Sequence, residues 1–483
     1  MVSYDSQSKK LFVTNASTNS IDVLVLADTN LTKEKSIELS SYGAGVNSVS
    51  AYNGYIAVAM QAENKQDNGT IEFFSADGVH LKSIIAGALP DMVTFSKDGS
   101  VVICANEGEP SYDYSNDPRG SITIVDLSAG ISEATGTTID FTGVTLPASG
   151  MKFYNSDKLA DLEPEYIAIN DNASKAYVTL QENNGIAIVD IASKSIDKIV
   201  ALGFKDFSLP GNEIDANKNG EIKLTNVNAF GMYQPDSIAV YSVNGQDYLV
   251  TANEGDAREY DAYDEETKAS KLTIDPSLDT TGLSDSVRVT PELGDTDGDG
   301  DYDQLYMMGT RSFSIWDNQG QLVFDSGSEL ARQVLSAVGD YNFNTRVDGT
   351  DKTEDIAELD NKGRPYYMVG NTAYFFEGKD ARSEKKGIEP EALTLGTING
   401  STYAFIGLEK QGGFMMYDIS NPEKPNFVKY INHIDYSKAP DKAGDLGPEG
   451  MVFIPASQSP NGKNLLVVAN EVSGSTSVYE VKQ

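Results

Sequence analysis

Short apolar segments with alternating polar positions recur along the whole chain. Each copy is an apolar strand that ends in a small residue, an amide and an acid. A turn then leads to a second alternating strand that often closes on Asp, as in residues 101–107 followed by 120–126. Period-two alternation in short segments bounded by turn residues predicts β-strands. A pair of strands cannot bury both of its faces alone, so neighbouring units are expected to stack.

A second pattern, a proline followed directly by an acid, precedes many of these strand pairs. Proline has no N–H to donate to a β-ladder, so it suits the first residue of a strand, and the acid after it projects from the strand's end. The copies are Pro90-Asp91, Pro164-Glu165, Pro235-Asp236, Pro390-Glu391 and Pro448-Glu449. The recurrence indicates that successive units present an acid at the same structural position.

Repetition in units of roughly forty residues predicts an all-β fold, a β-propeller with seven or eight blades, and the repeat count gives eight. A β-sandwich array is the alternative, but it would not explain one proline–acid pair per unit. We expect residues 1–483 to form a single propeller domain with loop insertions near 204–233, 256–290 and 339–388. Long loops on a rigid scaffold commonly carry function. The best candidate helix is 326–338, with apolar residues on one face.

The balance of acidic and basic residues limits the kinds of molecule that the protein can bind. The chain has 72 acidic and 37 basic side chains and a net charge of −35. Nucleic acid is excluded as a partner, because backbone phosphates require a basic face. No run of about 18 apolar residues is present to insert into a membrane. With 40% hydrophobic residues the chain can still bury a large core. These numbers predict a folded protein that attracts cations.

Alternating acids in the segment 295–303 predict a calcium-binding loop. Oxygen ligands at every second position, with glycines between them, allow a loop to wrap one hard cation. The ligands are Asp295, Asp297 and Asp299 through their side chains, Asp301 through its carbonyl or carboxylate, and Asp303 directly or through water. Tyr306 stands where an EF-hand has its bidentate glutamate, so the loop is only EF-hand-like. A solvated acidic turn is the alternative interpretation.

A propeller would assemble the repeated acids into two rings, because the inner strands of all blades run in the same direction around the axis. The acids after the prolines would line one mouth of the channel: Asp91, Glu165, Asp236, Glu391 and Glu449. The acids that end the next strand would stand close outside them: Glu107, Glu182, Glu254, Glu409 and Glu471. So many carboxylates in one funnel cannot all stay ionised unless cations neutralise them. Alternatively, each acid caps a local turn or pairs with backbone amides of the next blade.

Few basic residues lie near these acids. Arg311 and Arg258 are the candidates for clamping a phosphate that bridges bound metals, and a plain salt bridge is the alternative for each. With only two histidines, a zinc triad or a Ser-His-Asp relay is disfavoured. The single cysteine, Cys104, lies in an apolar run and is expected to be buried.

Several longer segments resemble the choice-of-anchor I family, and the likeness covers essentially the whole chain. They include residues 105–110, 162–167, 251–258, 294–301 and 444–450. That family includes bacterial proteins labelled alkaline phosphatases and is similar to mesenchyme-specific cell-surface glycoproteins. The resemblance implies a secreted or cell-surface propeller whose signal and anchor lie outside this chain. A looser likeness to calcium-dependent propeller phosphoesterases implies carboxylates around several cations at the channel mouth. The buried position expected for Cys104 favours calcium over iron.

Two functions follow from these features. The first is a metal-dependent phosphoesterase that acts on phosphate esters, with Ca²⁺ in the loop at 295–303, further Ca²⁺ in the funnel, and another divalent metal as the alternative. The second is a non-catalytic calcium-binding surface protein for adhesion, scaffolding or biomineral handling. The sequence favours the enzyme but leaves both open. A propeller that binds glycans or peptides would require exposed aromatic residues at the mouth.

Overall fold

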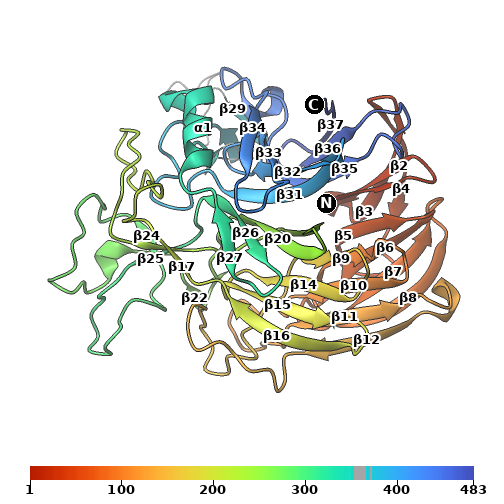
Figure 1. The fold of residues 1–483 in the computed structure, drawn as a ribbon, viewed down its shortest axis with the longest axis horizontal. Coiled ribbons are helices and arrows are strands. Elements are labelled where there is room, and N and C mark those ends of the chain that lie inside the picture. The colour runs from red at the N-terminus through yellow and green to blue at the C-terminus, as the bar shows by residue number, and fades with distance from the viewer. Residues whose placement is uncertain (347–348, 353–365, 370–371, 483) are drawn as a thin grey trace.

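Seven antiparallel sheets surround a common centre (Figure 1) within the residues that this computed structural model describes, 1–346, 349–352, 366–369 and 372–482. Six of the sheets have four strands and the last has three. In each sheet the strands follow one another from the centre outward in chain order. We number the sheets as blades 1 to 7.

The first four blades use consecutive strands. They are blade 1 with β1 (Val2–Asp5), β2 (Lys10–Asn15), β3 (Ser20–Ala27) and β4 (Asn30–Glu38); blade 2 with β5 (Gly45–Tyr52), β6 (Tyr55–Gln61), β7 (Asn68–Ser75) and β8 (His80–Ala88); blade 3 with β9 (Pro90–Phe95), β10 (Val101–Asn106), β11 (Ser121–Asp126) and β12 (Thr135–Asp140); and blade 4 with β13 (Ile167–Ile169), β14 (Lys175–Leu180), β15 (Gly185–Asp190) and β16 (Ser195–Ala201).

The last three blades include one that is interrupted. They are blade 5 with β19 (Ile238–Val243), β20 (Gln246–Asn253), β26 (Ser312–Asp317) and β27 (Leu322–Asp325); blade 6 with β31 (Pro390–Ile398), β32 (Ser401–Leu408), β33 (Phe414–Asp418) and β34 (Asn426–Ile431); and blade 7 with β35 (Pro448–Ile454), β36 (Leu465–Asn470) and β37 (Ser475–Glu480).

The core is divided among the interfaces between adjacent blades. One apolar cluster joins each neighbouring pair; Val102 and Cys104 of β10 face blade 2, whereas Ile103 and Ala105 face blade 4. Both faces of such a strand are therefore apolar, as expected for a sheet buried on both sides. A further cluster, with Leu11 and Val467, joins blade 7 to blade 1, and β35 packs against β1. The ring is closed by side-chain packing between its first and last blades.

The predicted propeller is confirmed, with seven blades. The count of eight is wrong because β20 pairs with β26, so the repeat copies at 249–254 and 313–317 are neighbouring strands of blade 5. The apolar segment 305–308, which resembles the first strand of a repeat, lies outside the blades, where β25 (Tyr306–Met307) pairs with β18 (Phe230–Met232). A long insertion has divided one blade into two apparent repeats.

The remaining strands lie outside the blades, mostly in the ranges 204–233, 256–290 and 339–388. They are β17 (Phe204–Asp206), β21 (Glu259–Tyr260), β22 (Tyr263–Asp264), β23 (Thr267–Lys268), β24 (Arg288–Val289), β28 (Gly349–Lys352), β29 (Tyr366–Val369) and β30 (Thr372–Phe375). Parts of the third range (347–348, 353–365 and 370–371) lie outside the described residues. Figure 1 shows β17, β22, β24 and β25 extending to the left of the ring.

The predicted helix at 326–338 is present as α1 (Glu329–Val338). Leu330 and Val334 pack on the cluster between blades 5 and 6. The other helical segments are short 3₁₀ turns: η1 (Ala16–Thr18), η2 (Ile131–Glu133), η3 (Ala269–Lys271), η4 (Asp340–Asn342) and η5 (Pro440–Lys442). Among the described residues, no helix has the length and apolar character needed to cross a membrane.

Trp316 tests the contribution of a blade interface to stability. Its indole lies between blades 4 and 5, 4.9 Å from the Tyr233 ring, and its Nε1–H donates to Thr251 Oγ1 at 2.9 Å. Trp316→Ala should lower the free energy of unfolding by about 3–5 kcal/mol, because it leaves a cavity. Leu322→Ala, at a residue 47% exposed, should change it by less than about 0.5 kcal/mol. Urea titration followed by circular dichroism measures both, and equal effects would contradict the assignment.

Candidate metal centre in the central channel

The proline–acid pairs lie at a repeated irregularity of the inner strands. The strand register shifts beside Asp91 in blade 3, Glu391 in blade 6 and Glu449 in blade 7. The same shift occurs at Asn47 of blade 2, the site of a weaker copy of the pattern. A β-bulge of this kind bends the strand and redirects a side chain. The bulge therefore turns each acid toward the channel.

A repeated backbone hydrogen bond places the second ring of acids beside the first. The residue before the proline has a positive φ, 49° at Leu89 and 52° at Glu389. Its carbonyl accepts the N–H of the acid that ends the next strand, at 3.0 Å for Glu107 and 2.9 Å for Glu409. The proline–acid corner and the end of the second strand are thus tied together in one blade after another.

Four blades bring their two acids close enough to perturb each other. These same-blade pairs are Asp91–Glu107, Glu165–Glu182, Asp236–Glu254 and Glu391–Glu409. Burial, and after it the charge of the same-blade partner, raises the pKa well above its ordinary value at Glu107, Glu165, Asp236 and Glu391. A raised pKa shows that the ionised form is poorly solvated at this site.

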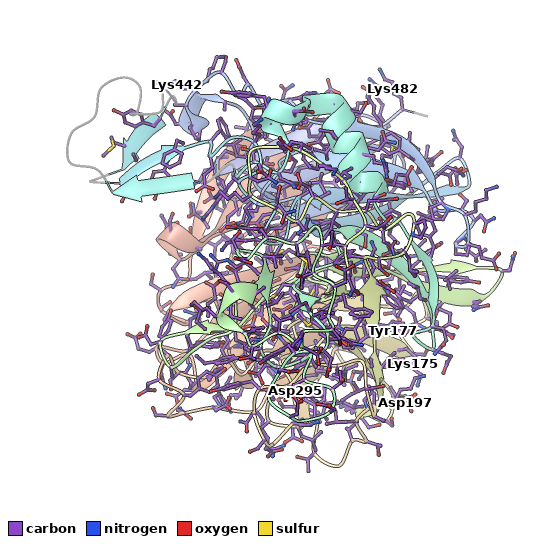
Figure 2. The ribbon with its side chains drawn as sticks, turned by 90° about the vertical axis from the view of Figure 1, so that its left-hand side faces the viewer. Lys175, Tyr177, Asp197, Asp295, Lys442 and Lys482 are labelled. Atoms are coloured by element: carbon purple, nitrogen blue, oxygen red, sulfur yellow. The ribbon has the colours of Figure 1, made fainter. Side chains whose placement is uncertain are left out.

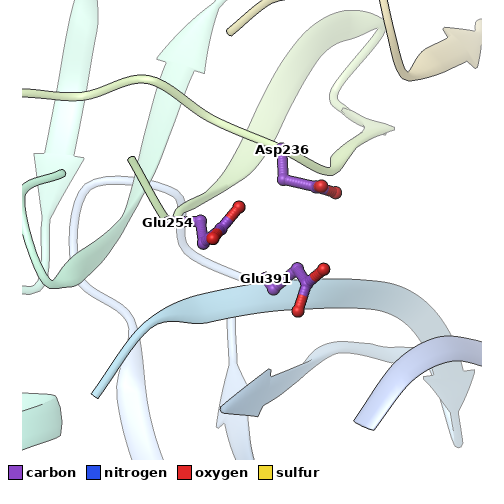
Figure 3. A group of neighbouring side chains, drawn as sticks. All are labelled: Asp236, Glu254 and Glu391. Atoms are coloured by element: carbon purple, nitrogen blue, oxygen red, sulfur yellow. The ribbon is translucent and has the colours of Figure 1, made fainter. Parts of the chain in front are cut away.

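Acids from different blades also converge. Carboxylate oxygens of Asp236, Glu254 and Glu391 lie within 4.8 Å of one another, and Figure 3 shows these three side chains pointing into one space. Glu254 belongs to a second such group, with Glu389 and Glu409.

The blade 7 acids behave differently from each other. Glu449 faces the channel, since its charge raises the pKa of Asp91, Asp236 and Glu391. Glu471 is exposed in the turn after β36, and its N–H donates to the carbonyl of Gly447 at 2.7 Å. The structure therefore brings nine of the ten predicted acids together and leaves Glu471 on the surface.

A cavity of about 450 Å³ opens on these acids. Its acidic side includes Glu165, Asp236, Glu254, Glu391 and Glu409, and its basic side includes Arg382, Lys385, Lys386 and Lys410. The basic side chains come from the segment directly before β31 and from the turn after β32. Negative and positive groups therefore line one cavity, and some are in direct contact, such as Lys386 Nζ with Glu254 Oε1 at 2.7 Å.

Several buried carboxylate oxygens in the channel have no hydrogen-bond partner in the described part of the chain. They are Oε2 of Glu165, Glu182, Glu389 and Glu391. Buried polar atoms are normally hydrogen-bonded, and an unsatisfied group points to a missing water or ion. A set of carboxylate oxygens is the donor set that hard divalent cations such as Ca²⁺ prefer. The residues present thus fit one or more divalent cations.

Two important acids were not predicted as site residues. Glu389 is 0% exposed, and Glu163 is buried beside Arg258. Both stand directly before a proline, so the sequence Glu-Pro-Glu in blades 4 and 6 was a signal for an additional acid. Burial alone would raise the pKa of Glu389, but Arg382 and Lys386 outweigh it and hold that pKa below its ordinary value.

Arg258 does not line the cavity. Its Nη2 donates to the Asp161 carbonyl and to Glu163, each at 2.9 Å, and its backbone N–H donates to Glu265. Glu265 is also paired at 2.6 Å with the fully buried Lys152. The guanidinium Nε and Nη1 have no hydrogen-bond partner, but the surrounding carboxylates disfavour a second anion there. Arg258 thus makes the salt bridge that was the alternative interpretation for it, inside a buried ion network, and its charge also acts on the channel acid Glu182.

Arg311 also lies outside the cavity. Its Nη1 donates to the Asp215 carbonyl at 2.5 Å, and its Nη2 donates to the carbonyls of Ser383 and Lys385 at 2.8 and 2.7 Å. The guanidinium therefore joins segments that are far apart in the sequence. This position corrects the expectation that Arg311 faces the funnel; it anchors the segment that carries Lys385 and Lys386.

The predicted calcium loop lies on the insertion of blade 5, outside the ring; Figure 2 views this side and labels Asp295. Oxygens of Asp295, Asp297 and Asp299 lie within 4.8 Å of one another. Asp301 and Asp303 form a separate group with Asp275, which was not predicted. Gly298 and Gly300, with φ of 80° and 97°, allow the loop to turn sharply between the acids. The loop thus divides its five acids between two clusters.

This chain is similar to a known protein family and to a characterised protein. The family model of the choice-of-anchor I domain matches residues 1–422. The chain belongs to the choice-of-anchor I family. Gigasin-3a of Magallana gigas is 24% identical over 220 residues, which cover 43% of this chain and 68% of that protein. The predicted family is confirmed.

One solved structure supports the propeller fold of this choice-of-anchor I protein, and nothing beyond its fold. Kuenenia stuttgartiensis hydrazine synthase matches with a TM-score of 0.50 and 11% identity, over 99% of this chain and 94% of that chain. Periplasmic gluconolactonase of Pseudomonas aeruginosa matches with a TM-score of 0.46 and 10% identity, over 98% of this chain and 92% of that chain.

The channel acids predict an unusual pH dependence in the presence of a chelator. Burial raises the pKa of Asp91 and Glu182 to about 7 and that of Glu409 to about 8. Unfolded acids ionise near pH 4, so between about pH 4 and pH 8 the folded state holds protons that the unfolded state has lost. The free energy of unfolding should therefore fall as the pH rises through this window. Calorimetry at several pH values measures it.

Asp91→Asn provides the comparison, because an amide cannot ionise. Its stability should fall less steeply with pH than that of the wild type. Asp197→Asn is the control: Asp197 is on outer strand β16, where it pairs with Lys175 at 2.8 Å, and both are labelled in Figure 2. Its curve should run parallel to the wild type. If the free energy of unfolding of Asp91→Asn fell as steeply with pH as that of the wild type, the raised pKa of Asp91 in the folded state would be refuted.

Proposed function

We propose that this protein is a metal-dependent phosphoesterase whose divalent cations are held by the channel acids. One observation carries the proposal: buried carboxylates from several blades and basic side chains line the same cavity of about 450 Å³. Carboxylates alone would repel a phosphate ester. Carboxylates that hold divalent cations, next to lysines and an arginine, attract one.

The residues divide into ligands and anion-binding groups. Glu254 is the central ligand, since it belongs to both groups of three acids in the channel. Arg382, Lys386 and Lys410 take the anion-binding role that the sequence suggested for Arg258 and Arg311, whereas Lys385 is paired with Glu266 at 2.6 Å. A bound divalent cation supplies Lewis acidity and lowers the pKa of a coordinated water. These basic side chains orient the phosphoryl group and stabilise the charge that develops on its oxygens.

We also propose that Asp295, Asp297 and Asp299 hold a calcium ion with a structural role. The three side chains are exposed and lie on the insertion, away from the acids of the channel. Each of them already accepts a backbone N–H of the loop, for example Gly298 N–H to Asp295 Oδ1 at 2.7 Å. A cation would therefore stabilise a loop conformation that these hydrogen bonds favour.

We also propose that the protein is extracellular or lies at the cell surface. The family assignment, the net charge of −35 and the proposed calcium ions support it. Millimolar calcium outside cells would keep weak calcium sites occupied.

A cluster of tyrosines favours adhesion as the second candidate function. Tyr112 and Tyr154 are 67% and 37% exposed, and they belong to a group with Tyr114, Tyr260 and Tyr263. Tyr260 and Tyr263 come from the short strands β21 and β22 and the other rings from loops, and Tyr154 stacks on Tyr263 at 3.8 Å. Burial, and after it the charges of Glu163, Glu109 and Glu182, raise the pKa of Tyr260, so the cluster lies close to channel acids. Exposed aromatic surface at the mouth suits contact with a glycan or a polypeptide. A calcium-binding surface protein without catalysis would use this face.

Hydrolysis of p-nitrophenyl phosphate and of bis(p-nitrophenyl) phosphate tests the enzymatic proposal. The wild type should turn over at least one of them with calcium, manganese or iron, and chelation should abolish turnover. Glu254→Gln should lower kcat/KM by about 100-fold or more, because it removes the ligand shared by both acidic groups. Asp197→Asn should match the wild type. Absence of turnover with each metal from neutral to alkaline pH would favour the adhesive function.

Calcium binding by the exposed loop is tested separately. Chelation should lower the melting temperature of the wild type, because an ion bound only by the folded state stabilises it. The double variant Asp297→Asn/Asp299→Asn should lose the part of this shift that the loop contributes. Asp279→Asn is the matched control, an exposed acid of the same insertion that also accepts an N–H two residues later, from Thr281. A double variant with the full wild-type shift would exclude the loop as a calcium site.

A further inference from the structure

Lys386 occupies a cation position inside the acidic cluster. Its Nζ lies 2.7 Å from Glu254 Oε1, 3.3 Å from Asp256 Oδ1 and 3.4 Å from Glu389 Oε2. The side chain is only 11% exposed. Three carboxylates around one ammonium form the kind of oxygen cage that a metal cation would also occupy. Lys386 therefore serves as a counter-ion supplied by the chain itself.

The neighbouring charges leave one oxygen incompletely satisfied. Arg382 donates to Glu389 Oε1 through Nε at 2.6 Å, and Lys410 is paired with Glu409. Glu389 is fully buried, yet its Oε2 accepts no hydrogen bond from the described residues; the Lys386 ammonium lies 3.4 Å away, and the charge of Lys410 also acts on this carboxylate. The Lys386 ammonium thus compensates part of the charge of Glu389 but donates no hydrogen bond to its Oε2. This oxygen remains available to a stronger cation.

The backbone that carries Lys386 is fixed, although its side chain is long and unbranched. We call residues 380–389, which lead into β31, the strap. Arg311 holds the strap through the carbonyls of Ser383 and Lys385, and Asn344 Nδ2 donates to Ser383 Oγ at 2.8 Å. The ammonium can therefore move only by rotation of its own side chain. The cavity that Lys386 lines provides the space for that rotation.

We propose that a divalent cation and the Lys386 ammonium compete for Glu254 and Glu389, and that the displaced ammonium then binds the anionic substrate in the adjoining cavity. The proposal rests on the metal-dependent function proposed above. A divalent cation on Glu254 would repel an ammonium 2.7 Å from the same carboxylate. Anion binding becomes conditional on metal binding, because Lys386 is neutralised by carboxylates until the metal releases it. Lys386 is thus a substrate-positioning residue.

Lys386→Met tests the exchange, with Lys385→Met as the matched control. Lys385 lies next in the chain and lines the same cavity, but it pairs at 2.6 Å with Glu266, outside the cage. Both variants are made with Asp297→Asn/Asp299→Asn, so that the exposed loop does not contribute to binding. Calcium affinity, measured by calorimetry, should rise about tenfold in Lys386→Met, within the usual range for coupling between two ligands, and stay unchanged in Lys385→Met.

Two further measurements separate this proposal from the proposed function. In chelator, Lys386→Met should melt at a lower temperature than Lys385→Met, because two buried acids lose their counter-ion. With calcium present, orthophosphate affinity should fall at least several-fold in Lys386→Met. Unchanged melting and unchanged calcium affinity in Lys386→Met would overturn the exchange. If neither protein binds calcium in the channel but Lys386→Met still melts lower in chelator, the metal function fails and only the counter-ion role is supported.

Chemical labelling of the wild type gives a test that does not depend on the folding of a variant. Acetylation by N-hydroxysuccinimidyl acetate, followed by mass spectrometry, reports the reactivity of each lysine. Lys386 should be protected in chelator and become several-fold more reactive when calcium is added, whereas Lys385 should change little. Equal labelling of Lys386 with and without calcium would contradict its release.

Discussion

Burial of like charges in the channel is the constraint on which the rest of the site depends. Closure of the ring brings acids from several blades into a space that water enters poorly, and each carboxylate raises the pKa of its neighbours. Such a cluster is stable only if protons, basic side chains or metal ions compensate the charge. The protein supplies part of this compensation through Lys386 and Arg382, which reach Glu254 and Glu389. Among the described residues, buried oxygens without a hydrogen-bond partner, such as Glu165 Oε2, mark places where a proton or a cation would compensate the charge.

Scaffold and site are physically separate. The blade interfaces are apolar, with residues such as Trp316 and Phe405 buried between neighbouring sheets, so the ring does not need the channel acids for closure. Arginines instead attach the insertions to the ring. Arg258 fixes the segment after β20 to the loop before β13 through Glu163, and Arg311 fixes the strap through backbone carbonyls. The two arginines that sequence context suggested as phosphate clamps thus hold loops next to the channel.

The sequence predicts the features that depend on local pattern and misses those that depend on distant partners. Period-two alternation identified the strands, and the proline–acid pair marked a bulge, as the register shift beside Glu391 shows. Blade number was misjudged because the insertion between β20 and β26 separates two strands that pair directly. The role of Arg311 depends on carbonyls more than seventy residues away, at Ser383 and Lys385, which nothing near position 311 indicates. Lys386 reaches Glu254 across an even larger separation of 132 residues.

The acids of this protein fall into two structural classes, and the difference bears on whether the channel acids are turn caps. Asp126 and Asp418 end the third strands of their blades and accept the N–H two residues later, from Ser128 and Ser420, at 2.9 Å. Such an acid is satisfied locally, and these hydrogen bonds lower the pKa of Asp126. Channel acids such as Glu391 have the opposite properties: a buried oxygen without a partner and a pKa raised by burial and by Glu409. Turn capping therefore accounts for the outer acids, whereas the charge of the inner acids is left to be compensated by protons, basic side chains or cations.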